Sequence, residues 1–96
     1  MTRTTPVYDP RGVVEAAPLS VAPRVRTLDG VRLALLDNTK WNAGKLLRGV
    51  RDRLAAKHAF AAVNYYRKES FAAAAAPDLL AEITARNDIV LTAIGD

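Results

Sequence analysis

The sequence predicts an α/β fold, a partial three-layer sandwich in which a βαβαβ unit forms three parallel strands, with the order 2-1-3 favoured. The first observation behind this prediction is that apolar runs of strand length alternate with stretches of helical periodicity. The second is that prolines concentrate before residue 31, where they indicate an extended N-terminal arm. Such alternation implies right-handed crossovers and a sheet whose faces are covered by helices.

The arm is expected to span residues 1–30, followed by an incomplete α/β domain of Rossmann-like or flavodoxin-like type in residues 31–96. Each proline removes a backbone donor and biases the preceding residue toward extended geometry. A short extended piece is expected at residues 12–15, and Leu28-Asp29-Gly30 is typical of a turn. The arm contains four of the five prolines, which are Pro6, Pro10, Pro18 and Pro23.

The first strand is expected at residues 31–36, a compact and mostly apolar run directly after that turn. A helix is expected at residues 42–57 because apolar side chains recur there at helical spacing, with Asn42 or Thr39 as its cap. The apolar positions on one side of this helix are Leu46, Leu47, Val50 and Leu54.

A second strand is expected at residues 60–66, with Val63 and Tyr65 on one face. Residues 67–76 are expected to form a loop, because Pro77 disfavours helical geometry at the residue before it. Pro77 suits the first position of the next helix, which ends at residues 86–87. The third strand is expected at residues 88–94, the most β-like stretch of the chain. The buried stripe of the second helix is expected to be Leu79, Leu80 and Ile83.

Composition limits the functions that this chain can have. Half of its 96 residues are apolar and 25% are charged, which is typical of a globular protein. The absence of cysteine excludes disulfides and thiol nucleophiles within these residues, and no metal or other cofactor is predicted. No apolar run is long enough for a signal peptide or a membrane span, so we expect a cytoplasmic protein without membrane partners.

A basic stretch raises the question of nucleic acid binding, since the net charge is +4. Asp52 interrupts the stretch and its spacing is helical, which favours the solvated face of an amphipathic helix. No zinc-finger, helix-turn-helix or aromatic RNA-binding pattern accompanies it, so nucleic acid is not an expected partner. The cations of this stretch are Arg48, Arg51, Arg53 and Lys57.

Polar residues follow the first and third predicted strands. In open parallel sheets, ligands bind outside the carboxyl ends of the strands where the strand order reverses, and the order 2-1-3 makes these two loops neighbours. Their carboxylates, amide, hydroxyl and ammonium could hold a polar substrate, and the start of the first helix could add an anion site. The predicted substrate-binding residues are Asp37, Asn38, Thr39, Lys40, Gly95 and Asp96.

Each of these residues also has a simpler interpretation. Asp37, Asn38 and Thr39 are ordinary turn and capping residues, and local sequence favours that role. Lys40 is by default a solvated surface cation and Trp41 a packing residue. His58, the single histidine, is expected to be a surface or capping residue. No nucleotide-binding or metal-ligand motif is present in the sequence.

A resemblance to a known family is carried by two stretches of the chain. Residues 33–43, LALLDNTKWNA, and residues 88–96, DIVLTAIGD, are fairly specific in combination. With Arg24, the turn at residues 28–30 and a Lys68-x-Ser70…Pro77 pattern, they resemble the UGSC family over about residues 7–96. The name of that family records a signature of selenocysteine or cysteine followed by Gly-Ser-Cys.

The resemblance implies thiol- or selenol-based redox chemistry at a site that residues 37–40 would line and Asp96 would adjoin. In the family the signature would come directly after Gly95 and Asp96, where the given sequence stops. We therefore expect an N-terminal fragment that is truncated at a selenocysteine codon and is inactive alone. Its expected partners are the missing C-terminal half or another copy of itself.

Two other functions are left open by the residues. The chain could be a small non-catalytic α/β module that binds a partner protein through the exposed edge of its third strand, because an unpaired edge is a template for pairing. It could also bind a phosphate-bearing ligand at the loop after the first strand, which nucleotides or sugar phosphates would reveal by thermal stabilisation.

Overall fold

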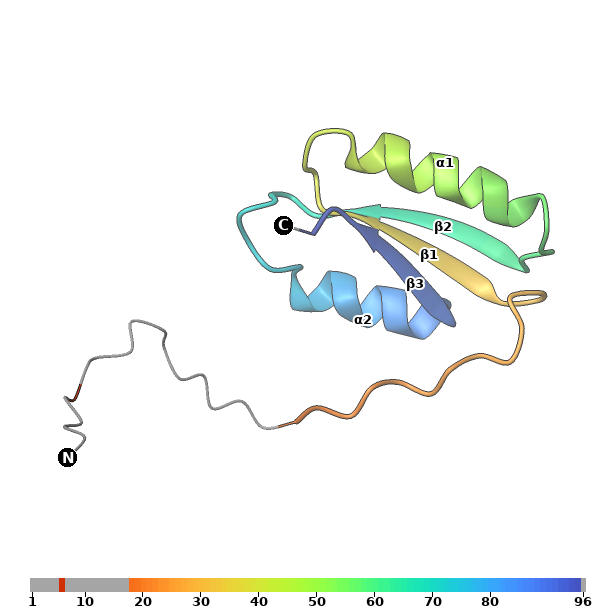
Figure 1. Ribbon diagram of the computed structural model, residues 1–96, viewed down its shortest axis with the longest axis horizontal. Helices are drawn as coiled ribbons and strands as arrows, with labels where there is room; N and C mark the ends of the chain where they lie inside the picture. Colours follow the sequence, from red (N-terminus) through yellow and green to blue (C-terminus); the bar gives the residue numbers. More distant parts are fainter. Residues whose placement is uncertain (1–5, 7–17, 96) are drawn as a thin grey trace, which may run out of the picture.

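The computed structural model describes residue 6 and residues 18–95, and its three strands form one parallel sheet in the order β2-β1-β3. Two helices alternate with the strands along the chain (Figure 1). The α/β class, the parallel pairing and the strand order predicted from the sequence are all confirmed. The elements are β1 (Arg32–Asp37), α1 (Ala43–Ala55), β2 (Ala62–Arg67), α2 (Pro77–Arg86) and β3 (Ile89–Ala93).

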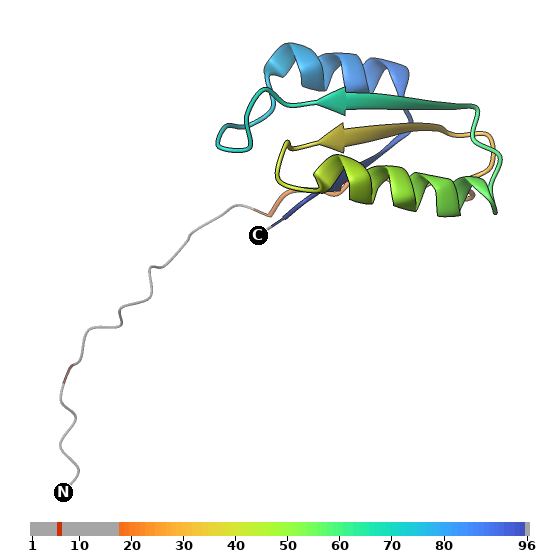
Figure 2. The same cartoon turned by 90° about the horizontal axis from the view of Figure 1, so that it is seen from above.

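The two helices lie on opposite faces of the sheet, so that the described domain has three layers (Figures 1 and 2). The central strand β1 is covered from both sides, and Leu33, Ala34 and Leu35 are therefore completely buried. This explains why its sequence is a continuous apolar run rather than an alternating one. The core sits around β1, and burial of these side chains is its main stabilisation.

Helix α1 contributes Ala43 and Leu47 to the core, and it begins one residue after the predicted start. Leu46 was expected on the buried side, but half of its surface is exposed. That expectation was wrong because Ala43 and Leu47, one turn apart, define the line that faces the sheet, and Leu46 lies beside it.

Helix α2 begins at Pro77 and ends at Arg86, as its proline and its terminal residues predict. Of the predicted stripe, only Ile83 is buried, whereas Leu79 is half-buried and Leu80 is exposed. Leu80 therefore does not face the sheet, which corrects the predicted stripe. Asp78 in the first turn and Arg86 in the last turn complement the helix dipole.

Strand β2 begins two residues later than predicted, at Ala62. The register pairs Ala62 with Arg32 and Tyr65 with Leu35, so the ladder can extend no further toward the amino end than β1 does. Ahead of it, the Ala61 N–H donates to the Val31 carbonyl at 2.9 Å. Val63 and Tyr65 share one face of β2, as their alternation predicts.

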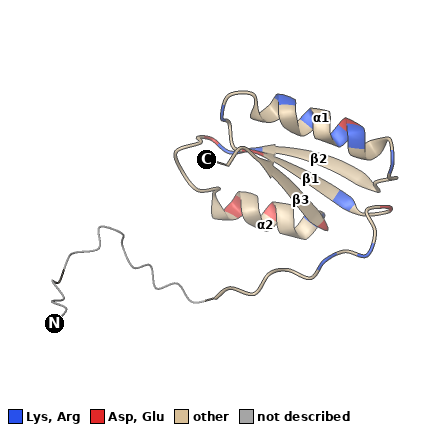
Figure 3. Ribbon diagram, in the orientation of Figure 1, with Lys and Arg blue, Asp and Glu red and all other residues tan. Residues whose placement is uncertain are grey.

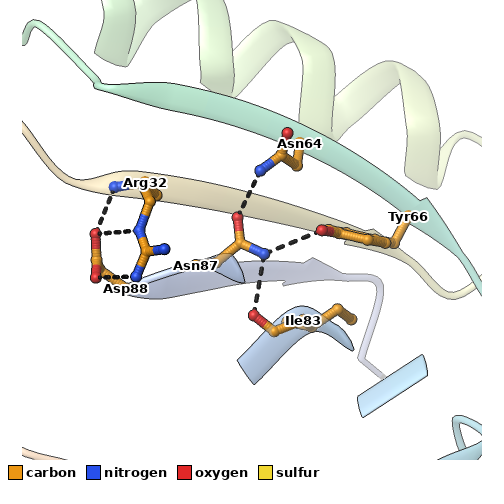
Figure 4. A network of polar contacts seen from close by, with 6 residues as sticks. All are labelled: Arg32, Asn64, Tyr66, Ile83, Asn87 and Asp88. Atoms are coloured by element: carbon orange, nitrogen blue, oxygen red, sulfur yellow. Dashed lines mark hydrogen bonds and ion pairs between the residues drawn. The ribbon is translucent and has the colours of Figure 1, made fainter. Parts of the chain in front are cut away.

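The amino end of the sheet is fixed by polar contacts (Figure 4). The Arg32 guanidinium donates to both carboxylate oxygens of Asp88, at 3.2 and 3.0 Å. The Asn87 side-chain amide donates to the Ile83 carbonyl at 3.0 Å and to the Tyr66 hydroxyl at 3.1 Å, and its oxygen accepts from Asn64 at 3.0 Å. The Asn87 bonds join the end of α2 to β2, and the Arg32–Asp88 bonds join the start of β1 to the residue before β3.

Residues 18–31 form no helix or strand. The predicted extended piece at residues 12–15, the rest of residues 1–5 and 7–17, and Asp96 lie outside the described residues, and the division into an arm and a domain stays a prediction. No helix within the described residues is long and apolar enough to cross a membrane.

Candidate functional site

The carboxyl ends of all three strands meet at one edge of the sheet, where the β1–α1 loop adjoins the end of β3 (Figures 1 and 2). Asn38 joins the two segments: its backbone N–H donates to the Ala93 carbonyl at 3.1 Å, and its side-chain amide donates to the Ile94 carbonyl at 2.6 Å. The expected proximity of residues 37–40 to residue 95 is therefore present. Asp96 lies outside the described residues.

Asp37 is the buried carboxylate of this edge, with only 5% of its surface exposed. One carboxylate oxygen accepts a hydrogen bond from the Thr39 backbone N–H at 2.7 Å. The other accepts from the Tyr65 hydroxyl, which reaches across from the neighbouring strand β2. A buried carboxylate is costly unless it is hydrogen-bonded, and both oxygens of Asp37 have a donor.

Tyr65 is a residue of this site that sequence reasoning missed, since its place in a strand suggested packing alone. Partial burial of its side chain, and then the hydrogen bond to Asp37, raise the pKa of Tyr65 above the ordinary value of 10.0. The Arg48 guanidinium of α1 lies over the ring at 5.8 Å from its centroid. The strand register could have revealed the contact, because Tyr65 pairs with Leu35 and so lies two residues before Arg67, the β2 residue that pairs with Asp37.

Gly44, in the first turn of α1, allows the helix to approach this pair closely. A Cβ atom at Gly44 would lie 2.9 Å from the Asp37 carboxylate and 2.9 Å from the Tyr65 hydroxyl. No side chain fits at that distance unless Asp37 or Tyr65 moves. The small residue therefore lets the start of α1 close over the end of β1.

The loop itself has an uncommon backbone conformation, with Thr39 at φ 68° and Asn42 at φ 65°. The left-handed region suits asparagine but disfavours a β-branched residue such as threonine. The Thr39 N–H bond to Asp37 and the Thr39 hydroxyl bond to the Asn38 carbonyl, at 2.6 Å, hold this shape. Strained residues of this kind cluster at functional sites.

The predicted capping roles are only partly correct. Asn42 is the residue before α1, but neither it nor Thr39 makes a side-chain hydrogen bond that caps the helix. Instead, Asp37 and Asn38 accept from backbone N–H groups two residues ahead, and the Asn38 oxygen lies 3.3 Å from the Lys40 nitrogen. These bonds are typical of Asx turns, the alternative role that local sequence favoured.

The remaining residues singled out from the sequence lie as follows. Lys40 is half-buried. Trp41 is 88% exposed, so its expected packing role is wrong; Ala43 takes the buried position that begins the helix. His58 lies away from this site, between α1 and β2, with its Nδ1 atom 3.5 Å from the Asp29 carboxylate at the turn before β1. The described residues contain no cluster of three or more side chains that could hold a metal ion.

The arrangement supplies a fixed amide at Asn38, a cation at Lys40 and a buried carboxylate whose oxygens already accept hydrogen bonds. Comparison with known proteins gives a family but no close relative: no curated protein and no solved structure matches the chain. The model of the UGSC family matches residues 6–96, a range that includes every helix and strand described above. The chain therefore belongs to the UGSC family.

Proposed function

We propose that this chain provides the substrate-facing edge of a thiol- or selenol-dependent redox protein. Membership of the UGSC family implies a selenocysteine or cysteine followed by Gly-Ser-Cys, and residues 1–96 contain no cysteine. The nucleophile would thus come from residues other than 1–96. The observation that carries the proposal is the double hydrogen bond of Asn38 to Ala93 and Ile94, which ties the end of β3 to the polar loop.

The residues of the loop would have different tasks in this chemistry. Asn38 would fix the end of β3, so that a chalcogen following residue 96 starts beside residues 37–40. The ammonium of Lys40 would favour a thiolate or selenolate over its protonated form, because a nearby cation lowers the pKa of such a group. Asp37, held by Tyr65 and by the Thr39 N–H, would keep the loop in its strained conformation.

The test begins with the nucleotides that follow the Asp96 codon. A UGA codon followed in frame by Gly-Ser-Cys is expected, and an unrelated continuation would contradict the proposal. The prediction that the 96-residue chain is a truncated product stays a prediction until that sequence is read.

The second step is an activity assay on the extended protein, with cysteine at the UGA position. It should reduce a hydroperoxide to an alcohol and water while two thiols become a disulfide, whereas residues 1–96 should show no turnover. Asn38→Ala should lower turnover of the extended protein at least tenfold, since the tie to β3 is lost. Arg53→Ala, in the last turn of α1 and so at the other end of that helix from the loop, is the matched control.

A second candidate function has one observation in its favour. Strand β3 lies at the edge of the sheet, and Val90 on it is 52% exposed. An unpaired edge strand with an apolar side chain can pair with another chain, so the protein could be a binding module without catalysis. Analytical ultracentrifugation distinguishes the two: a dimer that Val90→Lys dissociates supports the module, and a monomer at all concentrations opposes self-association.

A further inference from the structure

A cavity with a volume of about 260 Å³ lies beside the candidate site, between the end of β2 and the start of α2. Its polar side is formed by Arg67, Lys68, Glu69 and Ser70, and its apolar side by three alanines of the 73–76 segment together with Leu79. The loop that encloses it follows β2 and closes against the first turn of α2 (Figure 1). Nothing in the redox proposal makes use of this cavity.

The cavity adjoins the candidate site without being part of it. The Lys68 backbone N–H donates to the Asp37 carbonyl at 2.9 Å, which fixes the first residue of the loop against β1. The Ser70 hydroxyl oxygen accepts from the Ala72 N–H at 3.1 Å, and this bond leaves the hydroxyl proton available to a ligand. The polar side of the cavity is therefore held by the sheet and by its own turn.

The charges of the lining favour an anion. Neither Arg67 nor Lys68 forms an ion pair within the part of the chain that the structure describes. Glu69 offsets one of the two cations, so the lining carries a single net positive charge. That balance matches a monoanion better than a phosphate dianion, and the methyl groups of the alanines match a short aliphatic body.

We propose that this cavity binds a small aliphatic carboxylic acid in its ionised form. Arg67 and Lys68 pair with the carboxylate, the Ser70 hydroxyl donates a third hydrogen bond, and the alanine side chains and Leu79 contact the hydrocarbon part. The cavity is smaller than the sites of drug-sized ligands, so its size selects short acids. The proposal does not depend on the redox function, because binding is measured without turnover.

The experiment is an NMR titration of the ¹⁵N-labelled protein with three probes: butyrate, butyramide and inorganic phosphate. Butyrate should give saturable shifts of amides in residues 67–79, butyramide should give none, and phosphate should bind more weakly than butyrate. Absence of saturable butyrate shifts overturns the proposal. Equal binding of butyramide overturns the role of charge, and tighter binding of phosphate overturns the choice of a carboxylate.

Variants locate the site. Lys68→Met and Arg67→Gln should each weaken butyrate binding about tenfold, since each removes a charge-assisted hydrogen bond. Lys45→Met removes a cation from α1, on the opposite face of the sheet from α2, and should leave the affinity unchanged. Ser70→Ala, which keeps both cations, should weaken binding about threefold and serves if a charge variant fails to fold. Unchanged affinity in all three cavity variants overturns the proposal.

Discussion

The two helices of this domain are attached to the sheet by different means. Helix α1 is held by apolar packing, with Ala43 and Leu47 fully buried against the sheet. Helix α2 has a single buried apolar residue, Ile83, and is followed by the buried Asn87, whose side-chain amide bonds to β2. An apolar contact tolerates small shifts, whereas hydrogen bonds define distance and direction. The difference indicates that hydrogen bonds fix the position of α2 more than buried apolar area does.

The charges of the two helices differ as well (Figure 3). Helix α1 carries four cations and one carboxylate, and has no acidic residue in its first turn. Helix α2 carries Asp78, Glu82 and Arg86, with the acids toward its start and the cation at its end, the order that its dipole favours. Charge–dipole interactions therefore stabilise α2, the helix with fewer buried residues. The first turn of α1 has no acidic side chain that could interact favourably with its dipole.

The largest effect is expected at the apolar attachment. Leu47→Ala removes a fully buried side chain and should cost about 2–5 kcal/mol in the free energy of unfolding, because it leaves a cavity. Denaturant unfolding followed by circular dichroism measures it. Leu46→Ala, next to it but half exposed, is the control and should cost much less. Similar losses for both would mean that α1 does not pack as described.

The polar attachment should give a smaller but more local effect. Asn87→Ala leaves the Ile83 carbonyl, the Tyr66 hydroxyl and the Asn64 amide without their partner, and should cost about 1–3 kcal/mol. Hydrogen exchange should speed up in α2 more than in α1, which is the measurement that tests the comparison. Asn42→Gly serves as the control, because the Asn42 side chain makes no cap hydrogen bond and glycine suits its positive φ.

The contrast between apolar packing and hydrogen bonding also decides which features of the fold could be predicted from the sequence. Apolar patterning is a local signal, and it correctly indicated α1 and the buried run of β1. The strand order was instead favoured as the arrangement of flavodoxin-like folds, and the sheet has it. The side chains that join distant segments had no such signal: Asn87 was a helix-end residue and Tyr65 a strand residue. Their partners are 21 to 28 residues away, so only the strand register reveals them.

The candidate site shows the same limit. Residues 37–40 and 95 were predicted because strand ends in a parallel sheet meet at one edge, which is a rule of topology. Arg48 and Gly44 could not be predicted, since their roles depend on how closely α1 approaches Tyr65. The predicted packing of Trp41 failed because hydrophobicity alone does not decide whether a side chain at a helix start faces the sheet.

Two glycines of α1 give a matched pair. Gly44→Ala should destabilise the protein by about 1–2 kcal/mol, because the new Cβ atom would displace Asp37 or Tyr65. A Cβ atom at Gly49 would have no atom within 4 Å outside the neighbouring residues and backbone of its own helix, so Gly49→Ala should stabilise by about 0.5–1 kcal/mol, the usual gain in a helix. Thermal unfolding of both variants measures the difference, and the same sign for both would contradict the close approach of α1.

The smallest effect is expected at the exposed Arg32–Asp88 pair, and it should depend on pH. The hydrogen bonds from the Arg32 side chain and backbone hold the pKa of Asp88 below its ordinary value of 3.8. The unfolded chain therefore takes up this proton first as the pH falls, so the contribution of the pair is present above the unfolded pKa and is lost below it. Asp88→Asn should flatten the loss of stability below about pH 4 while leaving the neighbouring Asn87 network intact. An unchanged acid profile would mean that the pair does not favour the folded state, and that the polar attachment at this end of the sheet depends on Asn87 alone.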